Sequence, residues 1–175
     1  MIGSSWVVRA ATEDEVAGCT ALWTTAVATR DGAPESDAVR DRARAKFAAP
    51  RVALVVASDD RGLAGFGLVT APGTGRPDDP DDAAYLSLLA VDPRAQGHGL
   101  GRSLLRAAVA GAGGAGHRRC LLHALEGNAP ALRLYRSAGF HPVGAVFPHA
   151  LSGRPTRAWV ADAGTYGADG ELVGA

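Results

Sequence analysis

The sequence predicts an α/β (α+β) fold in which a mixed central sheet of about six to seven strands is covered by about four helices. Two observations lead to this class. The β-rich runs 51–57 and 63–69 are separated by a polar turn at 58–62, which favours an antiparallel hairpin. From Ala84 onward, strand and helix patterns alternate, which favours parallel pairing through a right-handed crossover. With 175 residues and 47% hydrophobic side chains, we expect a single domain over residues 1–175.

Short strand and helix signals fill the first third of the chain. Residues 6–10 are typical of a first strand. Thr12 and Glu15 have the spacing of a capping box, and apolar residues at helical intervals follow them as far as Val27. After a break at residues 31–34, a second and more charged helix is expected over residues 35–48.

The second half of the chain is expected to start after a Pro-, Gly- and Asp-rich loop at residues 71–83. Helix stops are indicated by the glycines after residue 110 and by Gly139. The last dozen residues are expected to be frayed. The elements predicted in this half are strand 85–91, helix 102–113, strand 119–125, helix 130–138 and a closing antiparallel pair, 140–146 with 156–162.

Charge and cysteine content exclude several classes of protein. Eighteen basic and eighteen acidic residues give zero formal net charge, and no basic block interleaves with aromatic residues. A nucleic-acid or anionic-membrane surface is therefore not expected. Cys19 and Cys120 are far apart and form no CxxC pair, so we expect neither a disulfide framework nor a metal site. The first ten residues lack a signal-peptide pattern, and a reduced, cytoplasmic location fits best.

The turn Gln96–Gly101 is the most informative segment, because it follows a strand that ends at Val91 and precedes a helix. Glycines let the backbone approach a ligand, and the first amides of a helix have no partner within it, so the turn is typical of a phosphate site. A P-loop is nearly excluded, because no lysine follows the glycines. The evidence for a dinucleotide-binding motif is weak. That motif has the spacing Gly-x-Gly-x-x-Gly with an acidic residue about twenty positions later, whereas here every second residue is glycine and the next acidic residue is Glu126.

The pattern Gln-x-x-Gly-x-Gly resembles the acetyl-coenzyme A loop of the GNAT superfamily of N-acetyltransferases. A second segment, Asn128 to Tyr135 followed by Gly139-Phe140, is similar to the other signature of that superfamily. The resemblance implies a GNAT fold with a splayed parallel strand pair at the cofactor site, and an acyltransferase that uses acetyl-CoA without a metal. It also implies a small-molecule or peptide amine as acceptor, direct attack in a ternary complex, and a possible homodimer.

The resemblance also implies roles for individual residues. The strand before the turn would bulge and offer backbone groups to the pantetheine arm, and amides of the turn would surround the pyrophosphate. Asn128 would meet the pantetheine arm, and Tyr135 would be the general acid that protonates the departing sulfur. The implied cofactor-binding residues are Leu89, Ala90, Val91, Gln96, Gly97, His98, Gly99, Leu100, Gly101, Arg102, Asn128 and Tyr135.

The general base is less specified by sequence. His123 lies where members that acetylate protein N-termini carry a glutamate, and a histidine there can accept the ammonium proton, because its ordinary pKa is near neutrality. Glu126, Asp92 and His149 are weaker candidates. The amine can also arrive neutral through desolvation.

The acceptor pocket carries no readable pattern. By analogy with the family it would involve residues 30–35, the strand face with Tyr85 and Ser87, and residues 149–155. The acidic loop 78–82 could attract a cationic acceptor, although such loops are usually solvated surface. Two other functions remain open: a non-catalytic acyl-CoA-binding regulatory module, and a protein that binds another phosphate ligand such as a nucleotide.

Overall fold

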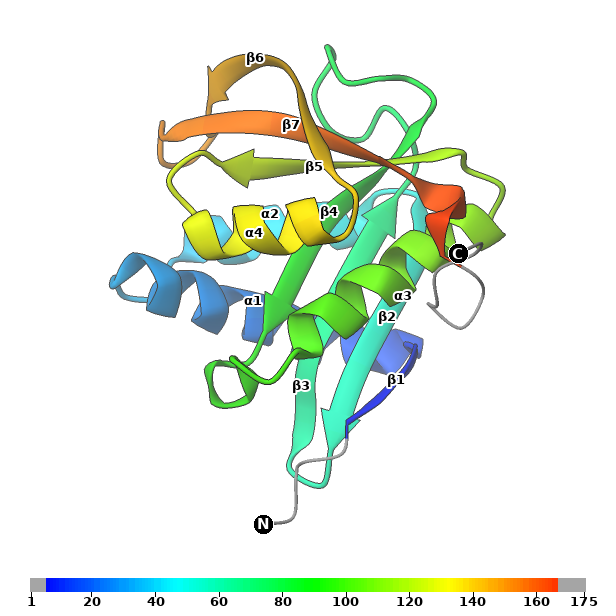
Figure 1. Ribbon diagram of the computed structural model, residues 1–175. Helices are drawn as coiled ribbons and strands as arrows, with labels where there is room; N and C mark the ends of the chain where they lie inside the picture. The colour runs from blue at the N-terminus through cyan, green and yellow to red at the C-terminus, as the bar shows by residue number, and fades with distance from the viewer. Residues whose placement is uncertain (1–5, 167–175) are drawn as a thin grey trace.

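The computed structural model describes residues 6–166, which form a seven-stranded sheet and four α-helices (Figure 1). The strand order is β1-β2-β3-β4-β5-β7-β6, and every neighbouring pair is antiparallel except β4 with β5. The mixed sheet confirms the predicted class. The strands are β1 (Val7–Ala10), β2 (Arg51–Asp59), β3 (Gly62–Thr70), β4 (Ala83–Val91), β5 (Arg119–Leu125), β6 (His141–Pro148) and β7 (Pro155–Asp162). The helices are α1 (Val16–Asp31), α2 (Asp37–Ala48), α3 (Leu100–Gly114) and α4 (Ala129–Ser137), with 3-10 turns η1 (Glu13–Glu15), η2 (Pro93–Ala95) and η3 (Ala163–Thr165).

The helix starts differ from the sequence expectation in ways that local chemistry explains. The capping box forms, with the Thr12 amide donating to Glu15 Oε2 at 2.9 Å, but its residues make the 3-10 turn η1 ahead of α1. The third helix begins at Leu100 rather than Arg102, because Gly99 in a left-handed conformation (φ 83°) is its N-cap. The expected fraying of the last dozen residues falls largely outside the described residues.

The parallel pair β4 and β5 opens after a short contact. Its register joins Ala83 to Arg119 and Tyr85 to Leu121, and no strand pairs with this side of β4 beyond Tyr85 in residues 6–166. On its other side, β4 continues to pair with β3, where a register shift between Leu68 and Val69 leaves Ser87 as a bulge. Figure 1 shows β4 and β5 diverging beyond their short paired segment.

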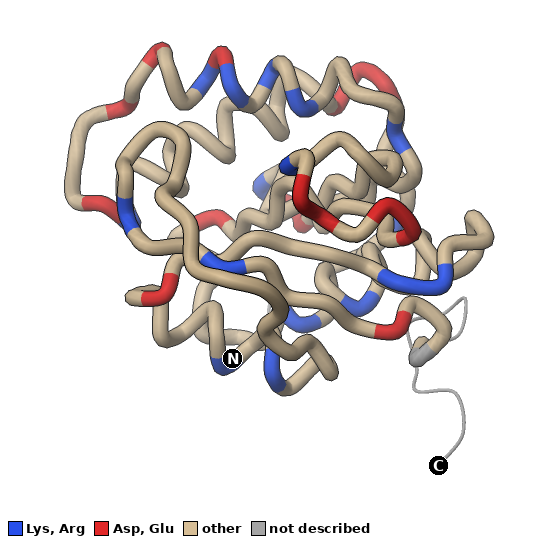
Figure 2. The backbone as a smooth tube through the Cα atoms, turned by 90° about the horizontal axis from the view of Figure 1, so that it is seen from above, with Lys and Arg blue, Asp and Glu red and all other residues tan. Residues whose placement is uncertain are grey.

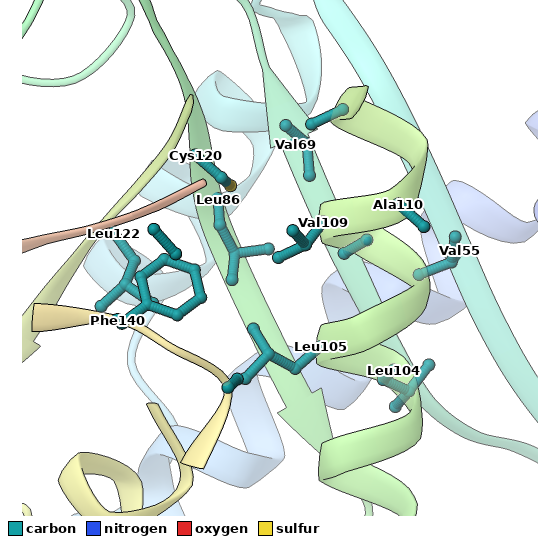
Figure 3. Close-up of a cluster of buried hydrophobic side chains, with 14 of the residues drawn as sticks. Val55, Val69, Leu86, Leu104, Leu105, Val109, Ala110, Cys120, Leu122 and Phe140 are labelled. Carbon is teal, nitrogen blue, oxygen red and sulfur yellow. The ribbon is translucent and has the colours of Figure 1, made fainter. Parts of the chain in front are cut away.

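Helices cover the two faces of the sheet with separate cores. Successive residues of a strand point to opposite faces, so Val55 lies with α3 whereas Leu54 and Val56 lie with α1 and α2. Figure 3 shows the first core, where Leu105 and Val109 of α3 approach the sheet. None of the helices in the described part of the chain is both long and apolar enough to cross a membrane.

Glycines allow α3 to pack unusually close to the sheet. A Cβ on Gly65 would lie 2.6 Å from Leu104 Cδ1 and 2.9 Å from the Ala90 carbonyl oxygen. A Cβ on Gly111 would lie 2.8 Å from the Ala53 Cβ. Because the helix rests against β2 and β3 at these points, its N-terminus is held beside the end of β4.

Candidate active site

A cavity of about 750 Å³ lies in the opening between β4 and β5. This volume is within the usual range for a small-molecule site. At one end the cavity reaches the N-terminus of α3, and at the other it reaches α1, α2 and the loop between β6 and β7. We call these the donor end and the acceptor end.

The donor end presents backbone amides. Gly97 and Gly99 have φ values of 80° and 83°, a conformation that favours glycine. From Gly97 to Gly101, no amide donates to a backbone or side-chain acceptor within residues 6–166; the next amide, that of Arg102, donates to the Gly99 carbonyl at 3.1 Å. Several N–H groups at the positive end of the α3 dipole are therefore available to an anion.

The side chains of this loop are placed unevenly. Gln96, Gly97, Gly99, Leu100 and Gly101 line the cavity. His98 and Arg102 do not, since the His98 ring packs against Trp6 at 5.9 Å and the Arg102 side chain is exposed. The structure thus brings the loop backbone to the cavity but not these two side chains.

The edge of β4 forms the floor of the cavity. Leu89, Ala90 and Val91, which were predicted to bind the cofactor, line it. The Gln96 side chain donates to the Val91 carbonyl at 3.3 Å, so this glutamine links the end of the strand to the turn. The conformation of the turn is therefore coupled to that of the strand edge.

Asn128 and Tyr135 both line the cavity from α4. The Asn128 side-chain Oδ1 accepts from the Ala131 amide at 3.4 Å and caps the helix, which leaves the side-chain NH₂ group as a donor. The Tyr135 ring makes an edge contact with Phe140 at 6.1 Å. Burial raises the pKa of Tyr135 to about 12, so the phenol is protonated at neutral pH.

His123 belongs to a chain of hydrogen bonds that crosses the acceptor end. Its Nε2 lies 2.9 Å from Asp79 Oδ1, and its Nδ1 lies 3.2 Å from the Tyr85 hydroxyl. Lys46 Nζ donates to the same hydroxyl at 3.3 Å and to the Ser87 carbonyl at 2.8 Å. A carboxylate only accepts, so Nε2 carries the proton, Nδ1 accepts from Tyr85, and Tyr85 accepts from Lys46.

Burial sets the acid-base properties of this chain. It lowers the pKa of His123, while the hydrogen bond to Asp79 opposes the change. Burial likewise lowers the pKa of Lys46 to about 7, with a smaller contribution from Arg42, and raises that of Tyr85. The His123 ring is also held between Tyr85 (4.9 Å) and Phe147 (5.1 Å).

Of the three weaker candidates for the general base, two have hydrogen-bond or ion-pair partners outside the cavity and one lies in the cavity wall. Glu126 pairs with Arg157 at 3.3 Å, and Asp92 accepts from the Arg94 amide at 2.9 Å; neither lines the cavity. His149 does line it, and its Nδ1 lies 3.0 Å from Ser152 Oγ.

Sequence reasoning missed Lys46 and Asp79. A signal for Lys46 was present, because Val39, Ala43 and Lys46 share one face of α2 and it is the only lysine in the chain. Asp79 had no such signal, since it stands among four other acidic or proline residues in the loop before β4. Only the fold brings it within hydrogen-bond distance of His123.

The family model of the acetyltransferase (GNAT) family matches residues 22–140. No curated protein matches the chain in sequence. Many solved structures share its fold. A candidate phosphinothricin N-acetyltransferase has a TM-score of 0.69 at 24% identity, covering 91% of this chain and 99% of its own. The ribosomal-protein-S18-alanine N-acetyltransferase of Escherichia coli has a TM-score of 0.68 at 19% identity, and the match covers 90% of this chain and 94% of its own.

A third similar structure is yncA from Salmonella typhimurium with its cofactor acetyl-CoA, which has a TM-score of 0.67 at 21% identity and covers 91% of this chain and 95% of its own. At these identities the solved structures show a common fold. The match to the family model covers more than half of the chain and agrees with the open β4–β5 pair and the amide-lined turn. The chain therefore belongs to the acetyltransferase (GNAT) family, and the protein is an acyltransferase.

Proposed function

We propose that this protein transfers the acetyl group of acetyl-CoA to a primary amine of a small molecule or peptide, by direct attack in a ternary complex. The observation that carries the proposal is the continuity between the open edge of β4 and the unpaired amides from Gly97 to Gly101. A strand edge suits the amide groups of a pantetheine arm, and the amides of a helix N-terminus suit a pyrophosphate. Acetyl-CoA would supply the activated thioester.

Tyr135 would assist departure of the thiol. Its phenol lies in the cavity wall and keeps its proton at neutral pH, because burial raises its pKa to about 12. Since a thiol with a pKa near 8.5 is a stronger acid than this phenol, full proton transfer from Tyr135 to the departing thiolate is energetically unfavourable. Tyr135 would therefore act chiefly by donating a hydrogen bond to the sulfur as negative charge develops there.

His123 would receive the ammonium proton through Tyr85 rather than directly. The Tyr85 hydroxyl stands between Lys46 and Nδ1 of His123, and it can pass its own proton to Nδ1 while taking one from the acceptor. The Asp79 carboxylate would stabilise the resulting imidazolium through Nε2. This arrangement keeps the expected base but makes Tyr85 the group that faces the amine.

A covalent acyl-enzyme route has little support. Cys19 and Cys120 are free and buried, neither lines the cavity, and burial raises the pKa of each thiol to about 12. The unpaired thiols also agree with a reducing compartment, and we propose a cytoplasmic enzyme whose residues 1–175 form one domain.

A thiol-release assay over a panel of primary amines tests the proposal. With varied acetyl-CoA and amine, we expect intersecting initial-rate lines and acetylated amine as product. Parallel lines would contradict direct attack. Tight acetyl-CoA binding without turnover for any amine would instead favour a regulatory acyl-CoA-binding module.

A further inference from the structure

The acceptor end of the cavity has an excess of positive charge. Four cations line the cavity wall, namely Arg30, Arg42, Lys46 and Arg76, whereas Asp31 is the one carboxylate among the lining residues that the structure describes. Asp31 is already neutralised: its Oδ1 lies 2.8 Å from both Arg30 Nε and Arg154 Nη2. These guanidinium groups lower the pKa of Asp31 to about 2.

Arg42 differs from the other arginines of its helix. Arg40 pairs with Asp37 and Arg44 pairs with Asp41, whereas Arg42 has no ion-pair partner within residues 6–166. Figure 2 shows both acidic and basic positions along α2, and those after Asp41 are all basic. Of the three arginines of α2, Arg42 is the one that lines the cavity, and it does so without a counter-charge.

Lys46 follows Arg42 by one helical turn, so both side chains project from the same side of α2. In its protonated form, which a bound anion would favour, Lys46 has three N–H donors, and the Ser87 carbonyl and the Tyr85 hydroxyl take two of them. One donor is left for a ligand. Neither of its two partners carries a negative charge.

A second, smaller cavity of about 280 Å³ adjoins the first at this point. Arg42, Lys46 and Ser87 line both cavities, and the hydroxyl-bearing Thr70 and Thr74 line the smaller one. No carboxylate lines the smaller cavity in the part of the chain that the structure describes. The Thr70, Thr74 and Ser87 hydroxyls already donate within the protein, so Arg42 and Lys46 are the groups here that suit an oxyanion.

Of the acidic loop before β4, Asp79 offsets part of this charge through His123, whereas Asp78 and Asp82 are engaged by arginines. Asp79 is bound to His123, Asp82 pairs with Arg119, and Asp78 lies 3.6 Å from Arg76. None of the three carboxylates lines either cavity. Figure 2 shows these acidic positions gathered in the loop rather than along α2. The loop is therefore poorly placed to attract a cationic acceptor, which the sequence had left open.

We propose that the acceptor is an amino acid or similar amine that carries a carboxylate, and that Arg42 and Lys46 hold this carboxylate while the amine faces Tyr85. The proposal rests on the proposed acetyl transfer and narrows its substrate class. Arg42 supplies a fork of donors that matches a carboxylate, and Lys46 supplies its remaining N–H. Their position beside Tyr85 sets the amine near the start of the Tyr85–His123–Asp79 chain.

The test compares matched acceptors. The common α-amino acids, β-alanine and 4-aminobutyrate are assayed for thiol release beside their carboxamides, which keep the amine and remove the negative charge. We expect kcat/KM for the preferred carboxylate to exceed that of its carboxamide by about tenfold or more, the usual worth of hydrogen bonds to a charged group. In Arg42→Gln, this preference should fall toward one.

The control is Arg44→Gln, two residues farther along α2 on its exposed side, where Arg44 pairs with Asp41 and lines neither cavity. This variant should keep the wild-type preference. A wild-type enzyme that prefers carboxamides or uncharged amines, or an Arg42→Gln enzyme with the full carboxylate preference, would overturn the anion site while leaving acetyl transfer intact.

A calorimetric titration separates this outcome from a failure of the proposed function. The CoA-loaded protein is titrated with the N-acetyl derivatives of the same amino acids and with the N-acetyl carboxamides. Absence of thiol release with every amine would contradict acetyl transfer, and the titration still tests the site. The carboxylate site is supported if the N-acetyl amino acids bind more tightly than the N-acetyl carboxamides and this difference is lost in Arg42→Gln. It is overturned if the two sets of compounds bind equally or if neither binds detectably.

Discussion

The two ends of the cavity offer different kinds of groups to a ligand. The donor end consists mainly of backbone: amides from Gly97 to Gly101 and the open edge of β4, all within one stretch of chain. The acceptor end consists of side chains from α1, α2, β4, β5 and two loops. A backbone site depends on local conformation, whereas a side-chain site depends on how distant segments are packed.

This contrast suggests how each end can change in evolution or by design. The donor end tolerates substitutions that keep the backbone and exclude negative charge. At the acceptor end, a single side chain such as Arg42 can alter which amine is accepted. Substitutions at the two ends should therefore separate cofactor affinity from acceptor choice.

The largest effect is expected from Gly101→Asp at the donor end. A Cβ at this position meets Leu134 and Val91 side chains at 3.6 Å, an ordinary contact, so the fold should accept it. The carboxylate would then repel phosphate beside the unpaired amides, and CoA binding should weaken by about a thousandfold, measured by calorimetry. Gly114→Asp, at the other end of α3, has nothing within 4 Å of its Cβ and should leave CoA affinity close to wild type. Equal affinities for the two variants would contradict a backbone phosphate site.

The same contrast explains how far the sequence could predict the molecule. The helix and strand order followed from periodicity and capping signals, and the donor turn followed from its glycines, because both are local properties. The Tyr85–His123 contact could not be predicted, because it requires the register that sets Tyr85 opposite Leu121. Asp79 and Lys46 reach this pair only through the folded loop and the packing of α2.

A smaller effect, confined to turnover, is expected from Tyr135→Phe. The variant loses one hydrogen-bond donor to the leaving sulfur, so kcat should fall by about a hundredfold, near the lower limit for such groups. The dissociation constant of acetyl-CoA should change by less than about twofold. Tyr166→Phe is a matched control, because Tyr166 is buried near α3 and does not line the cavity. A kcat close to wild type in Tyr135→Phe would exclude Tyr135 as the acid.

At the acceptor end, Asp79→Asn should change the pH dependence of kcat. Burial lowers the pKa of His123, and the nearby charges of Lys46 and Arg76 lower it further. The Asp79 carboxylate raises it. Removing the Asp79 charge should lower the His123 pKa further. The acidic limb of the kcat profile, where His123 becomes protonated, should then move to lower pH, and the plateau should fall by about tenfold.

Asp78→Asn is the control for this profile, since Asp78 is exposed and its carboxylate lies 3.6 Å from Arg76. It should reproduce the wild-type curve from pH 5 to 9. An acidic limb that stays in place or moves to higher pH in Asp79→Asn would contradict the coupling between Asp79 and His123.

A separate effect concerns stability, rather than binding or turnover, and the buried amine of Lys46. Burial lowers its pKa from 10.5 to about 7, so the unfolded chain binds more protons than the folded one between these values. The free energy of unfolding of the wild type, relative to Lys46→Met, should therefore rise with pH above 7 and be constant below it. Urea unfolding of both proteins at pH 6, 8 and 9.5 measures the difference, and a difference independent of pH would show that Lys46 keeps an ordinary pKa.

The central claim is that backbone amides of one turn bind the donor while separate side chains bind the acceptor. Amide chemical shifts in nitrogen-15 NMR spectra, recorded as acetyl-CoA is added to the wild-type protein, test it directly. The largest shifts should fall on residues 97–101 and 89–91, with little change in residues 42–46 until an amino acid is added. Shifts that centre on α2 with acetyl-CoA alone, or that leave residues 97–101 unchanged, would contradict the account.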